Sequence, residues 1–360
     1  MPADDFQIIY KRASALGVEI PGATYPDACK KSAESDEHSD AANDDGTAEQ
    51  FLTEMILVHT PNVRTIDYRV RNRTTIFGTL CSASNGMKRK PLFPKLIDFR
   101  MENLGSAQRV KPLAEWAPSL DSLWLETAQG PVAGLQFNTV RVLLLTKAQF
   151  NDAEMKELIR GFPNVKKFWF TWSINERIPT PSDYNQLLCS PQGVVDALQP
   201  LKAQLTELTL RFDDWQGFFC SHIRTEGPVN VVESFKDFEA LQRLDIDGAT
   251  LYDQTRNANE SYDAHIARPL DGILPGSLKS LNLMDLRRGP VDDDLLTFAS
   301  CAGNCCPELQ RIDYQRSFRK GGMYRIPPAE LSELKNEFGA NGVIFESHND
   351  TSHKPVSWRK

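Results

Sequence analysis

Three cysteines near the C-terminal end of the sequence are its only cluster of cysteines. Cys301, Cys305 and Cys306 have the spacing Cys-x3-Cys-Cys, and no histidine lies within 35 residues of them. This spacing is not that of a recognised zinc site. At helical spacing Cys301 and Cys305 share a face with Leu295 or Phe298, so we expect the cysteines to be small buried side chains. The sequence therefore predicts no metal and no cofactor here.

The other reactive residues do not form a catalytic constellation. The sequence contains no Gly-x-Ser-x-Gly, His-Glu-x-x-His or Gly-x-x-x-x-Gly-Lys-Ser/Thr motif, which are the signatures of common hydrolases, metalloproteases and nucleotide-binding enzymes. We identify no nucleophile-and-base motif around any of the six histidines. We therefore predict that the protein is not an enzyme. A hydrolase or a metal-dependent enzyme remains the second alternative.

A short apolar pattern recurs along most of the chain. In Phe162–Trp172 it is carried by Val165, Phe168 and Phe170, which follow the order apolar-x-x-apolar-x-apolar. Nine copies start at residues 63, 96, 120, 140, 165, 205, 241, 278 and 309, with separations between 20 and 40 residues. In several copies a proline lies two residues ahead of the first apolar position, where it ends a helix and favours extended chain. The pattern predicts repeated units of a helix followed by a strand.

Strand alternation divides each copy between two faces. The first, fourth and sixth residues face the core, whereas the fifth residue faces solvent. In three consecutive copies this fifth residue is large and apolar, and charged residues follow in the later copies. We predict that this face binds a partner through Trp124, Leu144, Trp169, Trp172, Arg211, Arg243 and Asp245.

Exposed tryptophans are typical of protein-binding hot spots because they bury a large area at little cost in rotamer entropy. The other interpretation is that the N-terminal segment or a loop folds over these side chains. Both interpretations stay open at this stage.

Composition and charge exclude several classes of function. The 360-residue chain is 41% hydrophobic and 25% charged, with a net charge of −7, so we expect no nucleic-acid partner. No apolar run approaches the length of a membrane span, and the N-terminus has no secretory-signal pattern, so we expect no membrane association. Seven cysteines, an odd number, favour a reducing compartment. We expect a cytoplasmic or nuclear protein.

The chain divides into three predicted parts. Residues 1–50 form an N-terminal segment with a short helix and a disordered acidic loop, since residues 32–50 hold seven acidic residues and no Lys or Arg. Residues 51–346 carry the repeats and end in a capping helix and strand. Residues 347–360 form a polar tail.

The repeats over residues 51–346 resemble those of the leucine-rich repeat family. The resemblance implies an α/β fold in the form of an irregular solenoid. About nine parallel strands would line its concave face, with helices and loops on the convex side. One departure concerns the ninth position of the repeat, which is Asn or Cys in regular members. Here it is Arg71, Leu104, Ala128, Ala148, Ser173, Asp213, Ala249, Leu286 and Ser317.

The proline-punctuated array, ending in a helix and the strand Val343–Phe345, is most similar to the repeat portion of fungal F-box proteins. That resemblance implies a substrate receptor of a Skp1–cullin–F-box ubiquitin ligase, with a Skp1-like adaptor as partner. Residues 1–50 contain no F-box segment opening with Leu-Pro, so no residue here carries that role. Our prediction is a non-enzymatic interaction scaffold that binds a protein on the concave face. A ligase receptor whose F-box is lost or truncated is the first alternative.

Overall fold

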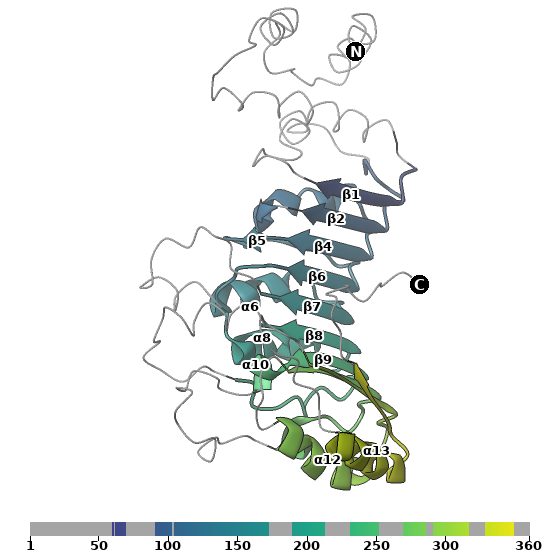
Figure 1. The fold of residues 1–360 in the computed structure, drawn as a ribbon. Coiled ribbons are helices and arrows are strands. Elements are labelled where there is room, and N and C mark those ends of the chain that lie inside the picture. The colour runs from purple at the N-terminus through teal and green to yellow at the C-terminus, as the bar shows by residue number, and fades with distance from the viewer. Residues whose placement is uncertain are drawn as a thin grey trace, which may run out of the picture.

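Ten parallel strands form one open sheet that follows the order of the chain (Figure 1). The computed structural model describes residues 60, 62–69, 91–102, 104–172, 189–212, 231–251, 269–285, 291–316 and 328–348. The strands are β1 (Thr65–Arg69), β2 (Asp98–Glu102), β4 (Ser122–Glu126), β6 (Val142–Thr146), β7 (Lys167–Thr171), β8 (Glu207–Arg211), β9 (Arg243–Asp247), β10 (Ser280–Asp285), β11 (Arg311–Arg316) and β12 (Ile344–His348). The predicted α/β class and parallel strands are confirmed, with ten strands in place of about nine.

The apolar repeat explains both the strands and their register. In every strand from β2 to β11 the first, fourth and sixth residues of the repeat are buried. Leu123 pairs with Leu143, and Leu143 pairs with Phe168, so equivalent positions of successive copies lie side by side. Each strand thereby adds its apolar residues to one continuous core.

Helices and turns connect the strands, and Figure 1 shows α6, α8 and α10 along one side of the strand column. The helices within the described residues are α5 (Leu113–Trp116), α6 (Asp152–Arg160), α8 (Pro191–Leu198), α10 (Gly248–Leu251), α11 (Leu270–Ile273), α12 (Val291–Cys305) and α13 (Pro328–Ala340). Two 3-10 helices are also described: η1 (Ala107–Val110) precedes α5, and η3 (Gln199–Leu201) directly follows α8.

The two longer central helices begin where the sequence places their caps. The Asn151 side chain accepts a hydrogen bond from the Glu154 backbone N–H at 2.8 Å, and the Glu154 carboxylate accepts one from the Asn151 N–H at 3.0 Å. This capping box satisfies two backbone donors that a helix start leaves unpaired. The Ser190 hydroxyl accepts from the Gly193 N–H at 3.0 Å at the start of α8. Both helices then bury their apolar faces against the sheet.

A second, small sheet occupies the turns that follow the first strands. The two-residue strands β3 (Gly105–Ser106) and β5 (Ala128–Gln129) pair in parallel, and Gln129 forms a bridge with Gln149. Thr127, with φ of 56°, and Lys147, with φ of 53°, reverse the chain ahead of this sheet in the left-handed region. Backbone hydrogen bonds thus link these successive turns to one another.

The C-terminal end of the sheet is covered as the sequence predicts. Strand β12 pairs in parallel with β11, and the Phe338 ring of α13 stacks on Phe345 with 5.3 Å between ring centroids. Gly342 makes the turn between them with a positive φ of 73°. Strand β12 ends at His348, two residues beyond the predicted boundary at 346. The predicted N-terminal part, 1–50, and the tail from 349 lie outside the described residues.

Among the described helices, none combines the length and the apolar character that crossing a bilayer requires.

Gly161, which ends α6, approaches a neighbouring backbone too closely for any side chain. A Cβ atom placed on it would lie 2.6 Å from the Leu135 carbonyl oxygen, and its own carbonyl accepts the Phe137 N–H at 2.7 Å. We expect Gly161→Ala to lower the free energy of unfolding by about 1–3 kcal/mol, because backbone must move to admit the methyl group. Urea unfolding measures this loss.

Gly339 in α13 provides the matched control. No atom lies within 4 Å of a Cβ placed there, so we expect Gly339→Ala to be neutral or to stabilise by about 0.4–1 kcal/mol. Equal losses of stability in the two variants would show that the close approach to Leu135 is not what destabilises Gly161→Ala.

Candidate protein-binding face

One side chain from each strand forms a continuous row along the face of the sheet opposite the apolar core. The register aligns the fifth residue of each repeat across all ten strands. The members are Asp67, Arg100, Trp124, Leu144, Trp169, Thr209, Asp245, Asn282, Asp313 and Glu346. We call this set the central row. Neighbouring members lie on strands about 4.8 Å apart, so they are in contact range.

The apolar part of the central row lies on β4, β6 and β7. Trp124, Leu144 and Trp169 are each half-buried. The guanidinium carbon of Arg100 lies 3.5 Å from the centre of the Trp124 ring, which is a close cation–π contact. The Trp124 indole N–H donates to the Thr146 hydroxyl at 2.8 Å. The chain thus covers one side of Trp124 and fixes its orientation.

Arg100 is itself held by three carboxylates. Its Nη2 donates to Glu102 at 2.7 Å and lies 4.0 Å from Glu126, while its Nη1 lies 3.9 Å from Asp67. The ammonium group of Lys147 pairs with Glu126 at 2.8 Å. The charged side chains next to Trp124 therefore largely neutralise one another. We call Trp124, Leu144 and Trp169 the apolar patch.

Arg211 connects the apolar part of the row to its polar part. Its guanidinium carbon lies 5.9 Å from the centre of the Trp169 ring. Its Nη2 donates to both carboxylate oxygens of Asp245, at 3.1 and 2.9 Å. The Asn282 amide donates to the same carboxylate at 3.0 Å. Charge-assisted bonds of this kind are about twice as strong as neutral ones, so they hold Arg211 close to Trp169.

The polar centre of the row is buried. Thr209, Asp245 and Asn282 are 5%, 2% and 6% exposed. Asp245 is therefore enclosed, although its position in the repeat predicts a solvent-facing side chain. Its charge is compensated by Arg211, whose side chain keeps 21% of its surface exposed. A buried carboxylate requires such a partner because an unpaired one is strongly destabilising.

The last two members of the row form an ion-pair corner at the edge of the sheet. Arg311 donates to both oxygens of Asp313 at 2.8 Å and to Glu346 at 2.7 Å. His348 lies 3.2 Å from the Asp313 carboxylate. Burial tends to raise the pKa of Asp313, but hydrogen bonds from Arg311 and His348 outweigh it and hold that pKa below its usual value.

The structure brings most of the predicted partner-binding residues to this face. Trp124, Leu144, Trp169, Arg211 and Arg243 are partly exposed. They do not form a bare patch. In the described part of the chain the strongly exposed large apolar side chain is Ile344, at 58%.

Two predicted site residues are not accessible. Trp172, at 3% exposed, lies in the hydrophobic core, and Asp245 is enclosed as described. Trp172 follows the last residue of β7, where alternation ends and the chain turns back toward the core. Phe212 holds the same place after β8 and is 1% exposed. The prediction that Trp172 lies on the partner-binding face is therefore wrong.

The predicted partner-binding residues do not include Arg100 and Thr146, which hold Trp124 in place on this face. Arg100 holds the fifth position of the copy that precedes Trp124, so the repeat register alone places it beside that ring. The contact with Thr146 was harder to predict, because it joins the fifth residue of one copy to the seventh residue of the next.

Neither a scan against protein-family models nor a search of curated protein sequences finds a match to this chain.

Removing the Asp245 charge should destabilise the sheet. We expect Asp245→Asn to lower the free energy of unfolding by about 1.5–3 kcal/mol, because it weakens the charge-assisted hydrogen bonds from Arg211 and Asn282 inside a buried site. Asp121→Asn, in the more exposed pair with Arg141, should cost about 1 kcal/mol or less. Chemical denaturation of both variants compares them. Similar losses would show that burial does not make the hydrogen bonds of Asp245 more stabilising than those of the more exposed Asp121.

The lowered pKa of Asp313 predicts a pH dependence of stability. Because its folded-state pKa is below the unfolded value, its contribution is present above the unfolded pKa of about 3.9 and is lost as pH falls through the folded pKa. We expect Asp313→Asn to cost on the order of 1 kcal/mol or less at pH 7. The difference in free energy of unfolding between Asp313→Asn and wild type should shrink below about pH 4. Urea unfolding at pH 7, 5 and 3 measures it; a difference independent of pH would contradict the ion-pair assignment.

Proposed function

We propose that this protein is a non-enzymatic interaction scaffold that binds a protein partner on the open face of its sheet. The observation that carries the proposal is the apolar part of the central row. Trp124, Leu144 and Trp169 lie side by side on three adjacent strands and keep part of their surface exposed. Tryptophan is enriched among the residues that dominate protein–protein binding energies.

The fixed geometry of these side chains supports the proposal. Trp124 is held by the stacked Arg100 guanidinium and by its hydrogen bond to Thr146. Arg211, in turn, is fixed near Trp169 by its bonds to Asp245. A partner that contacts preordered side chains loses less conformational entropy on binding than one that must order them.

The charges around the patch favour a protein over a nucleic acid. Arg100 and Arg211 are paired with carboxylates, and Asp313 and Glu346 add negative charge farther along the row. Mixed, largely compensated charge suits the polar rim of a protein interface. A phosphate backbone instead requires a field of uncompensated positive charge.

The two buried cysteines among the described residues also support a non-enzymatic function. Burial and the nearby Asp152 carboxylate raise the pKa of the Cys189 thiol far above its ordinary value, and burial raises the pKa of Cys306 to about 12. A cysteine nucleophile needs the opposite shift, because the thiolate is the reactive species. Neither thiol is prepared for catalysis.

For the architecture, we propose an irregular leucine-rich repeat solenoid. The strictly sequential order of the ten strands and the buried repeat positions support it. In this family the strand face is a common binding surface, which agrees with the placement of the patch. The small sheet of β3 and β5 takes the place of the family's side-chain ladder in the turns.

A charged residue in the middle of the patch tests the proposed face. We expect Leu144→Glu to weaken partner binding by at least about tenfold, because it places a charge among the apolar anchors. Affinity purification from the source cells with mass spectrometry, followed by titration of the purified partner, measures the loss. The melting temperature should stay within a few degrees of wild type, since Leu144 is half-buried on the open face.

Ala153→Glu is the matched control, because Ala153 is exposed on α6, away from the open face. It should retain every partner. If Leu144→Glu retains them too, the binding site lies elsewhere. Recovery of a Skp1-like adaptor with the wild-type protein would favour the ubiquitin-ligase alternative.

A further inference from the structure

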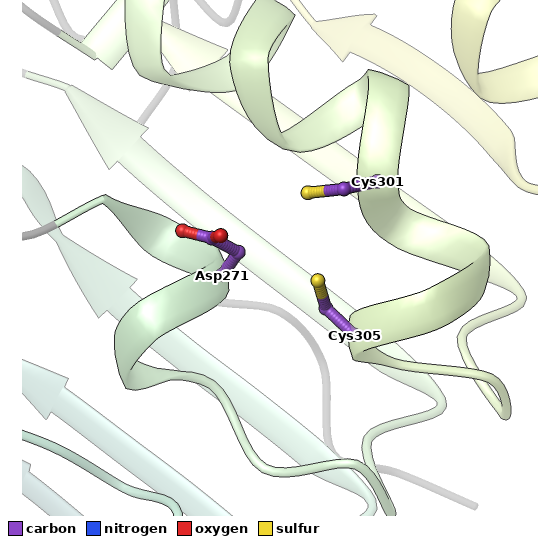
Figure 2. A group of neighbouring side chains, drawn as sticks. All are labelled: Asp271, Cys301 and Cys305. Atoms are coloured by element: carbon purple, nitrogen blue, oxygen red, sulfur yellow. The ribbon is translucent and has the colours of Figure 1, made fainter.

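Two cysteines and an aspartate converge between α11 and α12. The Cys301 and Cys305 sulfurs and a carboxylate oxygen of Asp271 all lie within 4.8 Å of one another. Figure 2 shows both thiols projecting from α12 toward the Asp271 carboxylate, which stands on the facing helix α11. The sequence predicts that these cysteines are buried, yet both are only partly buried. Cys306 is buried, and its Sγ lies 3.6 Å from the Pro275 carbonyl oxygen.

We propose that Asp271, Cys301 and Cys305 form a binding site for a thiophilic divalent cation such as Zn²⁺. The donor set is the first argument. Two sulfur ligands and a carboxylate suit zinc, which binds Cys at about 2.3 Å and Asp at about 2.0–2.2 Å. Tetrahedral angles then place neighbouring donors roughly 3.5–3.8 Å apart, which small side-chain rotations from the observed spacing can reach.

The Asp271 carboxylate provides an independent argument. Its Oδ1 atom is buried and accepts no hydrogen bond within the described part of the chain. A buried carboxylate oxygen without a donor is costly, and a cation bound by the Asp271 carboxylate would offset that cost. The other two members of this cluster are thiols, which are poor hydrogen-bond donors but good metal ligands.

A disulfide between Cys301 and Cys305 is the competing chemistry, and helix geometry opposes it. Residues four apart on a helix have Cβ atoms about 5–6 Å apart, whereas a disulfide needs about 3.5–4.5 Å. Bond formation would distort the C-terminal part of α12. Metal binding needs no such distortion, because each sulfur approaches the ion and not the other sulfur.

A bound metal would join two consecutive helices behind the last strands. Helix α11 precedes β10, and α12 follows it and packs against α13. The ion would therefore fix the helical cover of the C-terminal strands. Three protein ligands leave the fourth position of a tetrahedral zinc for water. The site is separate from the proposed partner-binding face, so either proposal can fail alone.

Cobalt titration tests the site, because Co²⁺ bound by thiolate gives a ligand-to-metal charge-transfer band in the near ultraviolet. The protein is the full chain with Cys29, Cys81 and Cys220, which lie outside the described residues, replaced by serine. After treatment with a chelator, we expect one Co²⁺ per chain, displaced by Zn²⁺. Cys301→Ser and Cys305→Ser should abolish the band, and Asp271→Asn should weaken Co²⁺ binding at least about tenfold.

Cys306→Ala is the matched control, because its sulfur lies against Pro275 and should leave the band intact. Circular dichroism shows whether each variant is folded. As a second measurement, Zn²⁺ should raise the melting temperature of the Cys29/Cys81/Cys220-to-Ser protein and leave that of Cys301→Ser unchanged. The proposal is overturned if folded protein gives no band, if the band survives in Cys301→Ser, or if Asp271→Asn binds Co²⁺ as tightly as the parent.

Discussion

Parallel pairing between chain neighbours, in one constant register, is the constraint on which the rest of the structure depends. Because side chains alternate along a strand, a slip of one residue would turn every buried apolar position of that strand toward solvent. The apolar residues of each repeat, such as Leu123 and Leu125, fix the register from the core side. The open face inherits the same alignment. Trp124, Leu144 and Trp169 are therefore neighbours as a consequence of core packing.

This dependence explains what the sequence could and could not predict. The strands, their parallel order and the helix starts at Asn151 and Ser190 follow from local patterns, and the structure confirms them. Whether Trp172 lies in the core or on the open face depends on where β7 ends, and the repeat pattern fixes that end only to within a residue or two. Asp271 approaches Cys301 only because α11 and α12, which precede and follow β10 in the chain, pack against each other. No spacing in the sequence encodes that contact.

The polar centre of the central row shows how the same register produces a buried charge. Asp245 occupies the position that carries Trp169 two strands earlier and Leu144 three strands earlier, yet it is 2% exposed. Arg211 and Asn282, from the two neighbouring strands, supply its hydrogen bonds. Asp247, two residues farther along β9, directly precedes α10. Its carboxylate accepts hydrogen bonds from the Thr250 N–H at 2.8 Å, from the Thr250 hydroxyl at 2.6 Å and from the Phe212 N–H. Asp245 and Asp247 therefore hold this part of the sheet together by hydrogen bonds, where the apolar part of the row uses apolar contacts.

Arg211 connects the polar centre of the central row to its apolar part. Its guanidinium is fixed on one side by the buried Asp245 carboxylate and lies near the Trp169 ring on the other. Arg100 has the corresponding role at the opposite end of the apolar part, between its three carboxylates and Trp124. Each arginine has its charge balanced within the chain, so a partner that covers the patch does not have to compensate it. Under the proposed function, a partner would need an apolar surface that fits Leu144 between the two rings, and that requirement would select by shape more than by charge.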